Sequence, residues 1–245
     1  MKKHIPNAIT LLNLFSGLIA LKFAFENQVE WAFFFVCLGI FFDFFDGFFS
    51  RMLKVSSPLG LQLDSLADMV TSGVVPAVVM YKLIEQQSLM CGENCTIYSG
   101  TFGQIAPYFG FIIAIGACLR LAKFNIDTRQ TDSFIGLPTP ANALFIISLP
   151  LVITNGGIDW LSNFLSQPNI LMAISFLSAW IMNEDLPLFS LKIKKKSFKG
   201  NQLKILFLLL SVGLLLIFKI IGVPMIILFY ILLSFVKNLR KTPTV

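Results

Sequence analysis

Four aspartates stand in two pairs within otherwise apolar sequence. Asp43 and Asp46 are three residues apart, and Asp64 and Asp68 are four apart, so each pair lies on one face of its helix. A carboxylate at membrane depth costs about 2.5–3.5 kcal/mol, so four of them need a compensating interaction. Brought together, the two faces would repel each other unless cations lay between them. Divalent cations prefer oxygen ligands, and the pairs therefore predict a metal site.

Residues next to the aspartates fit phosphate chemistry. Two metal ions about 3.5–4 Å apart can hold a pyrophosphate and stabilise the attacking and leaving oxygens of a displacement at phosphorus. Gly47 lets a ligand approach its helix closely, and Arg51, one turn further on the same side, suits bidentate phosphate binding. Ser57 in the linker offers a hydroxyl group, and Gly60 opens the next helix. One carboxylate could then act as the general base on an attacking hydroxyl group.

The elements that position these residues are predicted to be membrane helices. Hydrophobic residues make up 56% of the 245-residue chain and charged residues 13%, which argues against a soluble protein. Apolar segments follow one another with short polar breaks, a pattern typical of a polytopic helical membrane protein. Because α-helices satisfy their own backbone polar groups in lipid, we predict an all-α helical bundle.

The hydropathy pattern predicts about eight transmembrane helices. Their approximate bounds are residues 8–25, 31–49, 60–84, 102–121, 141–153, 169–182, 203–218 and 221–236, with loops at 85–98 and 154–168 among the connections. Asn7 is a candidate cap of the first helix. Asp43 and Asp46 fall in the final turns of the second helix, and Asp64 and Asp68 in the first turns of the third. The four carboxylates therefore lie at the same end of two neighbouring antiparallel helices.

The basic residues predict the orientation of the helices. Of the 19 Lys and Arg residues, only Lys22, Lys82 and Lys219 lie toward the helix ends opposite the carboxylates. By the positive-inside rule, the carboxylates and both termini face the cytoplasm, in an integral protein of the cell membrane. The net charge of +6 is thereby explained. Because no basic helix carries interleaved aromatic residues, nucleic-acid binding is unsupported.

Histidine and cysteine limit the chemistry further. The single histidine, His4, lies near the N-terminus, which excludes histidine-based catalysis. Cys91 and Cys95 share the predicted outer loop and could form a disulfide in an oxidising compartment, although the sequence does not require one.

The spacing of the acidic stretch resembles the signature of the CDP-alcohol phosphatidyltransferases. It reads Asp43-x2-Asp46-Gly47-x2-Ser50-Arg51-x8-Gly60-x3-Asp64-x3-Asp68, with Ser50 where the family usually has Ala. Both residues are small, so close packing should survive. The resemblance implies a six-helix catalytic core, here residues 1–185. A basic cytoplasmic loop (186–202) and two extra helices with a basic tail (203–245) would follow.

The resemblance also implies roles for individual residues. The four aspartates would bind two divalent metal ions, Mg²⁺ or Mn²⁺, and Asp68 would also accept a proton. Gly47, Arg51, Ser57 and Gly60 would contact the CDP-lipid. The opening PNAIT is similar to the family's opening and implies that Asn7 and Thr10 approach the nucleotide.

The alcohol acceptor must be inferred from other segments. PNAITLLNLFSG, RLAKFNI and FIGLPTPAN resemble the membrane-integral phosphatidylserine synthases, over most of the first 185 residues. Arg120 and Lys123 could pair with the carboxylate of L-serine, and Asn125 could bind its ammonium or carboxylate group. The two cations could instead anchor their helix at lipid headgroups. The resemblance implies transfer of a phosphatidyl group from CDP-diacylglycerol to L-serine, giving phosphatidylserine and CMP, a step of phospholipid biosynthesis. Members of the family often form homodimers.

Two other functions stay open at the level of sequence. A sister enzyme that uses glycerol 3-phosphate or inositol phosphate would share every motif residue, and its phosphate would also need cations. An ion-coupled transporter would use its carboxylates to bind Na⁺ or H⁺ at mid-membrane. The position of the aspartates at helix ends, and the lack of a visible broken helix, argue against the transporter.

Overall fold

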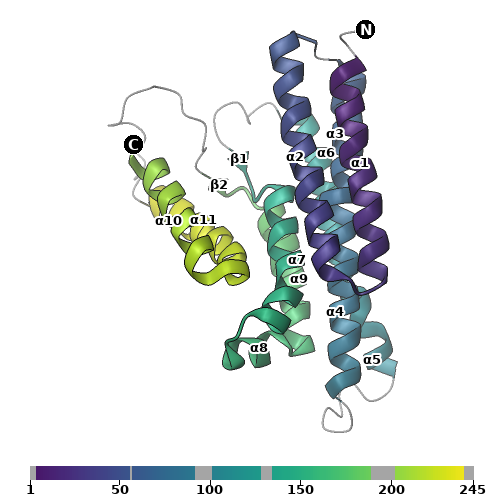
Figure 1. Cartoon of the computed structure of the whole chain (residues 1–245), viewed down its shortest axis with the longest axis vertical. Helices are drawn as coiled ribbons and strands as arrows, with labels where there is room; N and C mark the ends of the chain where they lie inside the picture. Colours follow the sequence, from purple (N-terminus) through teal and green to yellow (C-terminus); the bar gives the residue numbers. More distant parts are fainter. Residues whose placement is uncertain (1–3, 56, 92–100, 128–133, 189–201, 240–245) are drawn as a thin grey trace.

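Each apolar segment of the sequence forms a helix in the computed structural model of the chain (Figure 1). The structure describes residues 4–55, 57–91, 101–127, 134–188 and 202–239. Within these residues the only strands are β1 (Phe134–Ile135) and β2 (Pro187–Leu188), which pair antiparallel. The all-α class is therefore confirmed.

The helices follow the predicted order. Their bounds are α1 His4–Phe25, α2 Val29–Leu53, α3 Pro58–Asp68, α4 Val75–Cys91, α5 Thr101–Ile105, α6 Ile112–Ile126, α7 Thr139–Asn155, α8 Asp159–Leu165, α9 Pro168–Asn183, α10 Gln202–Phe218 and α11 Gly222–Leu239. A π-helical turn, Met69–Val74, joins α3 to α4, and a 3-10 segment, Ala106–Phe111, joins α5 to α6.

The predicted count of eight membrane-crossing helices is not confirmed. Within the described residues, five helical segments are long and apolar enough to cross a membrane, or six if the bent pair α8–α9 is one span. The five are His4–Phe25, Val29–Leu53, Pro58–Met90, Thr101–Ile126 and Ile205–Val236. α7, with 17 residues, is shorter than a typical span of about 20. These lengths and compositions are those of an integral membrane protein.

The segment 205–236 is folded into a hairpin of α10 and α11. The backbone of Lys219 has a φ of 49°, in the left-handed region, and the chain turns there. The Phe207 ring of α10 then lies 6.2 Å from the Phe229 ring and 5.7 Å from the Tyr230 ring of α11. α11 packs along α7, so the hairpin lies against the rest of the bundle (Figure 1).

Three boundary predictions are wrong. The loop predicted at 154–168 contains α8, which meets α9 at an angle of 73°, so one helix pair is broken after all. Asn7 does not cap the first helix, because α1 already begins at His4; Pro6 is tolerated there since the first turn needs no backbone donor. α4 continues into the predicted loop as far as Cys91. Cys95, the possible disulfide partner of Cys91, falls outside the described residues.

Close packing around Thr71 fixes α1, α2 and the π-helical turn together. The Thr71 hydroxyl donates a hydrogen bond to the backbone oxygen of Asn13 at 3.2 Å. A Cβ atom on Gly39 would lie 2.6 Å from Thr71 Cγ2, and one on Gly17 would overlap Thr71 Oγ1. The two glycines therefore let three backbones approach around one buried threonine, next to the aspartates of α3.

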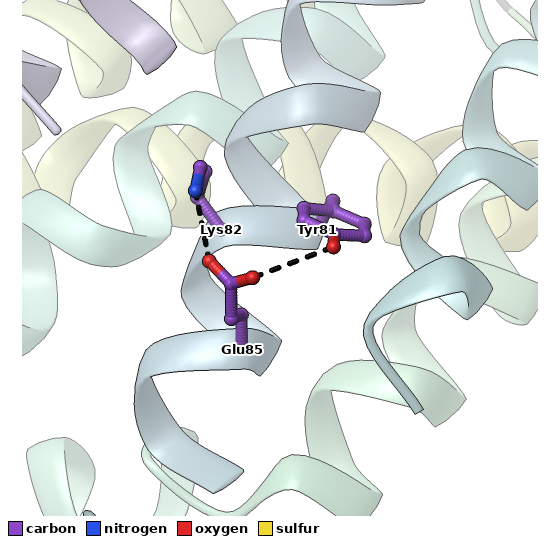
Figure 2. A network of polar contacts seen from close by, with 3 residues as sticks. All are labelled: Tyr81, Lys82 and Glu85. Carbon is purple, nitrogen blue, oxygen red and sulfur yellow. Dashed lines mark hydrogen bonds and ion pairs between the residues drawn. The ribbon is translucent and has the colours of Figure 1, made fainter. Parts of the chain in front are cut away.

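The opposite end of the bundle carries a polar network on α4 (Figure 2). Glu85 accepts hydrogen bonds from Lys82 Nζ at 2.8 Å and from the Tyr81 hydroxyl at 3.4 Å. Lys82 also borders a cavity of about 550 Å³ formed with α2 and α7. None of the four aspartates lines this cavity, and Asp43 and Asp46 lie near the other end of α2, so the cavity does not belong to their site.

Candidate metal and phosphate site

Three of the four predicted metal ligands come together. One carboxylate oxygen from each of Asp43, Asp64 and Asp68 lies within 4.8 Å of the other two. Asp43 comes from α2, and Asp64 and Asp68 come from successive turns of α3. The prediction that the two helix faces meet is therefore confirmed in geometry.

Asp46 faces the same region but is held differently. Its Oδ2 accepts a hydrogen bond of 2.5 Å from the Thr10 hydroxyl of α1, and its side chain is 6% exposed. Its charge still interacts with those of Asp43 and Asp64. Thr10, which the family resemblance implies near the nucleotide, thus orients an aspartate and also borders the cavity described below.

Asn13 is a site residue that the sequence analysis missed. Its Nδ2 donates a hydrogen bond to Asp68 Oδ1 at 3.0 Å, and its side chain is fully buried. Thr10, Asn13 and Ser16 recur every three residues along α1, and all three are buried. That polar stripe in an apolar helix was the signal that could have indicated which face of α1 meets the aspartates.

A cavity of about 170 Å³ lies beside the carboxylates. Five of the six residues predicted to contact the CDP-lipid line it: Asn7, Thr10, Gly47, Ser57 and Gly60. Asp46 and Asp64 also line it, so the cavity adjoins the carboxylate cluster. It is smaller than the roughly 300–1,000 Å³ of a typical ligand pocket, and so has room for a diphosphate rather than for a whole nucleotide.

The two glycines that line the cavity, Gly47 and Gly60, have different surroundings. A Cβ atom on Gly47 would lie 3.7 Å from the nearest Arg51 guanidinium nitrogen, so the exposed Arg51 side chain lies back over Gly47. The Gly60 backbone N–H donates to Ser57 Oγ at 3.0 Å, and Ser57 caps α3. Pro58 occupies the first turn of α3, where its missing N–H costs nothing.

Arg120 reaches the cluster from α6. Its side chain is 7% exposed, and its charge interacts with that of Asp68. Its guanidinium carbon lies 6.0 Å from the centre of the Phe124 ring, and its Nε atom has no hydrogen-bond partner. A buried guanidinium with an unpaired donor, whose charge interacts with that of Asp68, suits an anionic group of a ligand.

The other two predicted serine-binding residues are engaged elsewhere. Lys123 is exposed and donates from Nζ to the backbone oxygen of Asn183 at 3.4 Å. Asn125 pairs with Ser65 of α3, through hydrogen bonds of 3.0 and 3.1 Å. Asn125 therefore lies beside the helix of Asp64 and Asp68, whereas Lys123 ties α6 to the end of α9.

The donor set fits divalent cations. The three clustered groups are all carboxylates, the preferred ligands of Mg²⁺ and related ions. Asp64 Oδ1 is buried and has no hydrogen-bond partner, which is costly unless a cation or a donor completes it. Within the described residues, Arg120 is the buried cation near the cluster, and one positive charge does not balance four carboxylates.

Comparison with known proteins gives one consistent result. The family model described as CDP-alcohol phosphatidyltransferase matches residues 3–182. The chain is 33% identical over 150 residues to the CDP-diacylglycerol–serine O-phosphatidyltransferase of Bacillus subtilis, covering 60% of this chain and 75% of that protein. It is 33% identical over 144 residues to the protein of the same name from Helicobacter pylori, covering 58% of this chain and 55% of that protein.

A longer match joins the chain to a Mycobacterium bovis protein with the same name. The two are 30% identical over 193 residues, which cover 76% of this chain and 59% of that protein. The chain thus spans between about half and three quarters of the length of these curated relatives.

Proposed function

Because the chain belongs to the CDP-alcohol phosphatidyltransferase family, we propose that it transfers a phosphatidyl group from CDP-diacylglycerol to L-serine, releasing CMP. The observation that carries the proposal is the meeting of Asp43, Asp64 and Asp68 within 4.8 Å, beside a cavity that is lined by motif residues of both helices, among them Asp46, Gly47 and Gly60. The named relatives are serine phosphatidyltransferases, which supports serine as the acceptor.

Asp43, Asp46, Asp64 and Asp68 would hold two divalent cations, Mg²⁺ or Mn²⁺. Such cations, when bound, offset the negative charge of the diphosphate and of departing CMP. The short Thr10–Asp46 and Asn13–Asp68 hydrogen bonds fix the direction of two of the four carboxylates before any ligand arrives. Preorganised ligands of this kind need little rearrangement on binding.

Asp68 would act as the general base. In the transfer, the serine hydroxyl gives its proton to Asp68 while its oxygen forms a bond to the lipid-bearing phosphorus. The bond from that phosphorus to the bridging oxygen of the diphosphate breaks, and CMP leaves with the electron pair. Asn13 holds one oxygen of Asp68, which leaves the other oxygen free to take the proton.

The CDP-lipid would lie with its diphosphate in the cavity of about 170 Å³. Gly47 and Gly60 allow the diphosphate to approach both helices, and Arg51 would pair with a phosphate oxygen. Asn7, Thr10 and Ser57 offer side-chain polar groups from α1 and the start of α3. The exposed aromatic and aliphatic faces of the helices would meet the acyl chains and the surrounding lipid.

Arg120 would bind the carboxylate of serine. It is buried, its charge interacts with that of Asp68, and its Nε atom has no hydrogen-bond partner, so it can draw the serine carboxylate toward the base. Asn125 would assist after exchanging its hydrogen bonds to Ser65. Lys123, being exposed and directed to α9, would add positive charge at longer range.

We propose the same division of the chain as above: a catalytic core of residues 1–185, a basic loop at 186–202, and the hairpin and tail at 203–245. The excess of basic residues at the aspartate end supports a site that faces the cytoplasm, with both termini on that side. The homodimer stays a prediction from the family resemblance.

One assay separates the proposal from its alternatives. Purified protein in lipid is given CDP-diacylglycerol with L-serine, glycerol 3-phosphate or inositol phosphate, each with and without Mg²⁺ or Mn²⁺, and CMP release is measured. We expect that CMP is released from CDP-diacylglycerol only when L-serine is the acceptor, and only when the metal ion is present. Release with another acceptor instead assigns a sister enzyme, and ion flux in liposomes without any CMP release assigns a transporter.

A further inference from the structure

A long apolar cavity of about 390 Å³ lies between the core helices and the final hairpin. Its walls come from α7, α9 and α11, and α8 contributes Leu161, Phe164 and Leu165. The residues proposed to hold metal or the CDP-lipid, all of them described, are absent from its lining. The cavity is therefore a separate feature of the fold.

Asn142 of α7 is a polar side chain in this apolar lining. It is 0% exposed, and both its Nδ2 donor and its Oδ1 acceptor lack a hydrogen-bond partner. Ser178 of α9 also lines the cavity, and its hydroxyl donates to the backbone oxygen of Ser175 at 3.2 Å. Buried amides in native proteins are almost always hydrogen-bonded. Because Asn142 borders the cavity, a ligand there can supply the missing partners.

The part of α7 that lines the cavity is about as long as one leaflet of a bilayer is deep. Asn142, Phe145, Leu149 and Val152 recur on one face of α7 and line it in order. Ten residues of helix separate the first from the last, a rise of about 15 Å. That is half of the roughly 30 Å hydrocarbon core of a bilayer, and so the depth of one leaflet. Leu161 and Leu165 of α8 pack in one cluster with Val152, at the far end from Asn142.

We propose that this cavity binds one long-chain fatty acid in its uncharged form, with its chain along α7 and its carboxyl group on Asn142. A protonated carboxyl group presents a carbonyl acceptor and a hydroxyl donor side by side. These match the Nδ2 donor and the Oδ1 acceptor of the primary amide.

The lining also favours an uncharged head group. Among the described residues that form the cavity, no side chain is charged. A phospholipid would bring a phosphodiester anion, which needs a cation or water when it is taken from the membrane surface. A carboxylic acid in apolar surroundings instead keeps its proton. α11 forms one wall, through Pro224, Ile227 and Ile231, and this gives the hairpin a part in ligand binding.

The test uses the full-length protein in nanodiscs and palmitic acid that carries a photoreactive diazirine in its chain. Labelled peptides are identified by mass spectrometry. We expect saturable labelling confined to residues 137–152, 161–165, 174–181 and 221–231, which contain the lining. Unlabelled palmitic acid should compete, whereas its methyl ester, which lacks the donor and so loses one neutral hydrogen bond, should compete about threefold less well.

Variants at Asn142 complete the test. Asn142→Ala and Asn142→Leu should each raise the palmitic acid concentration for half-maximal labelling about tenfold, the equivalent of two neutral hydrogen bonds. Asn142→Leu should also raise the melting temperature without ligand, because it removes an unsatisfied buried amide. Asn155→Ala, on the exposed end of the same helix, is the matched control and should bind like the wild type.

Three results would overturn the proposal. They are labelling spread evenly over the lipid-facing helices, equal competition by the methyl ester or by phosphatidylglycerol, and unchanged labelling in both Asn142 variants. None of these readouts depends on CMP release, so the test is independent of the proposed transferase activity.

Discussion

Asn13 of α1 donates a hydrogen bond of 3.0 Å to Oδ1 of Asp68, the last residue of α3. The amide and the carboxylate come from helices that are separated in the sequence by the whole of α2. Asp68 is only 9% exposed, so its direction is set by this contact rather than by water. α1 is therefore more than an apolar helix of the bundle, because it orients the proposed base.

Asn13→Ala should lower kcat about 10- to 100-fold, since a hydrogen bond to a charged group contributes about 1.5–3 kcal/mol. KM for CDP-diacylglycerol should change little, because Asn13 does not line the cavity beside the carboxylates. Steady-state kinetics of CMP release check both values. Ser16→Ala is the control: Ser16 is buried on the same helix but donates only to Leu12 O. An equal loss in the control would contradict the positioning role.

Asp68→Asn should reduce CMP release by about 10²- to 10⁴-fold, the usual contribution of a general base. Binding of CDP-diacylglycerol, measured by calorimetry in detergent, should be largely kept because the amide preserves the size of the side chain. Appreciable turnover in this variant would remove Asp68 as the base.

Thr10→Val should weaken metal activation. It removes the hydroxyl that holds Asp46 while keeping the shape of the side chain. Loss of such a supporting hydrogen bond typically costs 10- to 100-fold in metal affinity, so about tenfold more Mg²⁺ or Mn²⁺ should be needed for half-maximal CMP release. Asp43→Ala, which removes a proposed ligand itself, should have a larger effect. Thr10→Ser retains the hydroxyl and should resemble the wild type; an unchanged metal requirement in Asp43→Ala would refute its ligand role.

Gly39→Ala should destabilise the fold by about 1–3 kcal/mol, because the new Cβ would lie 2.6 Å from Thr71 Cγ2. Thr71→Ser removes that methyl group but keeps the hydroxyl, so the double variant should recover part of the loss. Thermal unfolding of the purified protein measures both. Gly213→Ala, where a Cβ meets nothing within 4 Å, should be neutral or slightly stabilising. A double variant no better than Gly39→Ala would show that the clash lies elsewhere.

Arg120→Ala should raise KM for serine at least about tenfold, the value of one charge-assisted hydrogen bond, with a much smaller effect on KM for CDP-diacylglycerol. Lys123→Ala should have a weaker effect on serine, since its ammonium group is exposed and directed to Asn183 O. Initial rates with each substrate varied in turn separate the two constants. Equal changes in both constants for Arg120→Ala would exclude a serine-specific contact.

Sequence alone was sufficient where one physical rule dominated. Hydropathy located the long helices of the described residues but missed the short α8, because membrane helices must be apolar over most of their length. The spacing of Asp43 and Asp46, and of Asp64 and Asp68, placed each pair on one face, and the faces do meet. Length was harder to predict: α7, α8 and α9 are short or bent, and apolar content does not say which helices cross the bilayer.

Tertiary partners were not predictable in the same way. Asn13 is a single polar residue in an apolar helix, and only the fold shows that it meets Asp68. Arg120 and Lys123 are three residues apart and have the same charge, yet Arg120 is buried and Lys123 is exposed. Their difference arises from what packs against α6, namely α9 and the π-helical turn, which periodicity does not reveal.

The π-helical turn Met69–Val74 has a consequence for the rotational phase of the third apolar segment. A π turn contains one residue more than an α-helical turn, and one residue of α-helix corresponds to a rotation of about 100°. The direction in which Asp64 and Asp68 point around the helix axis is thus rotated relative to that of the buried residues Val75 and Val79, which follow. In a single uninterrupted α-helix, these two groups of side chains could not both point in the directions that they have here. The extra residue changes the rotation of the helix between its two halves. One continuous helical segment can therefore direct carboxylates to the cluster at one end and apolar side chains to the core at the other.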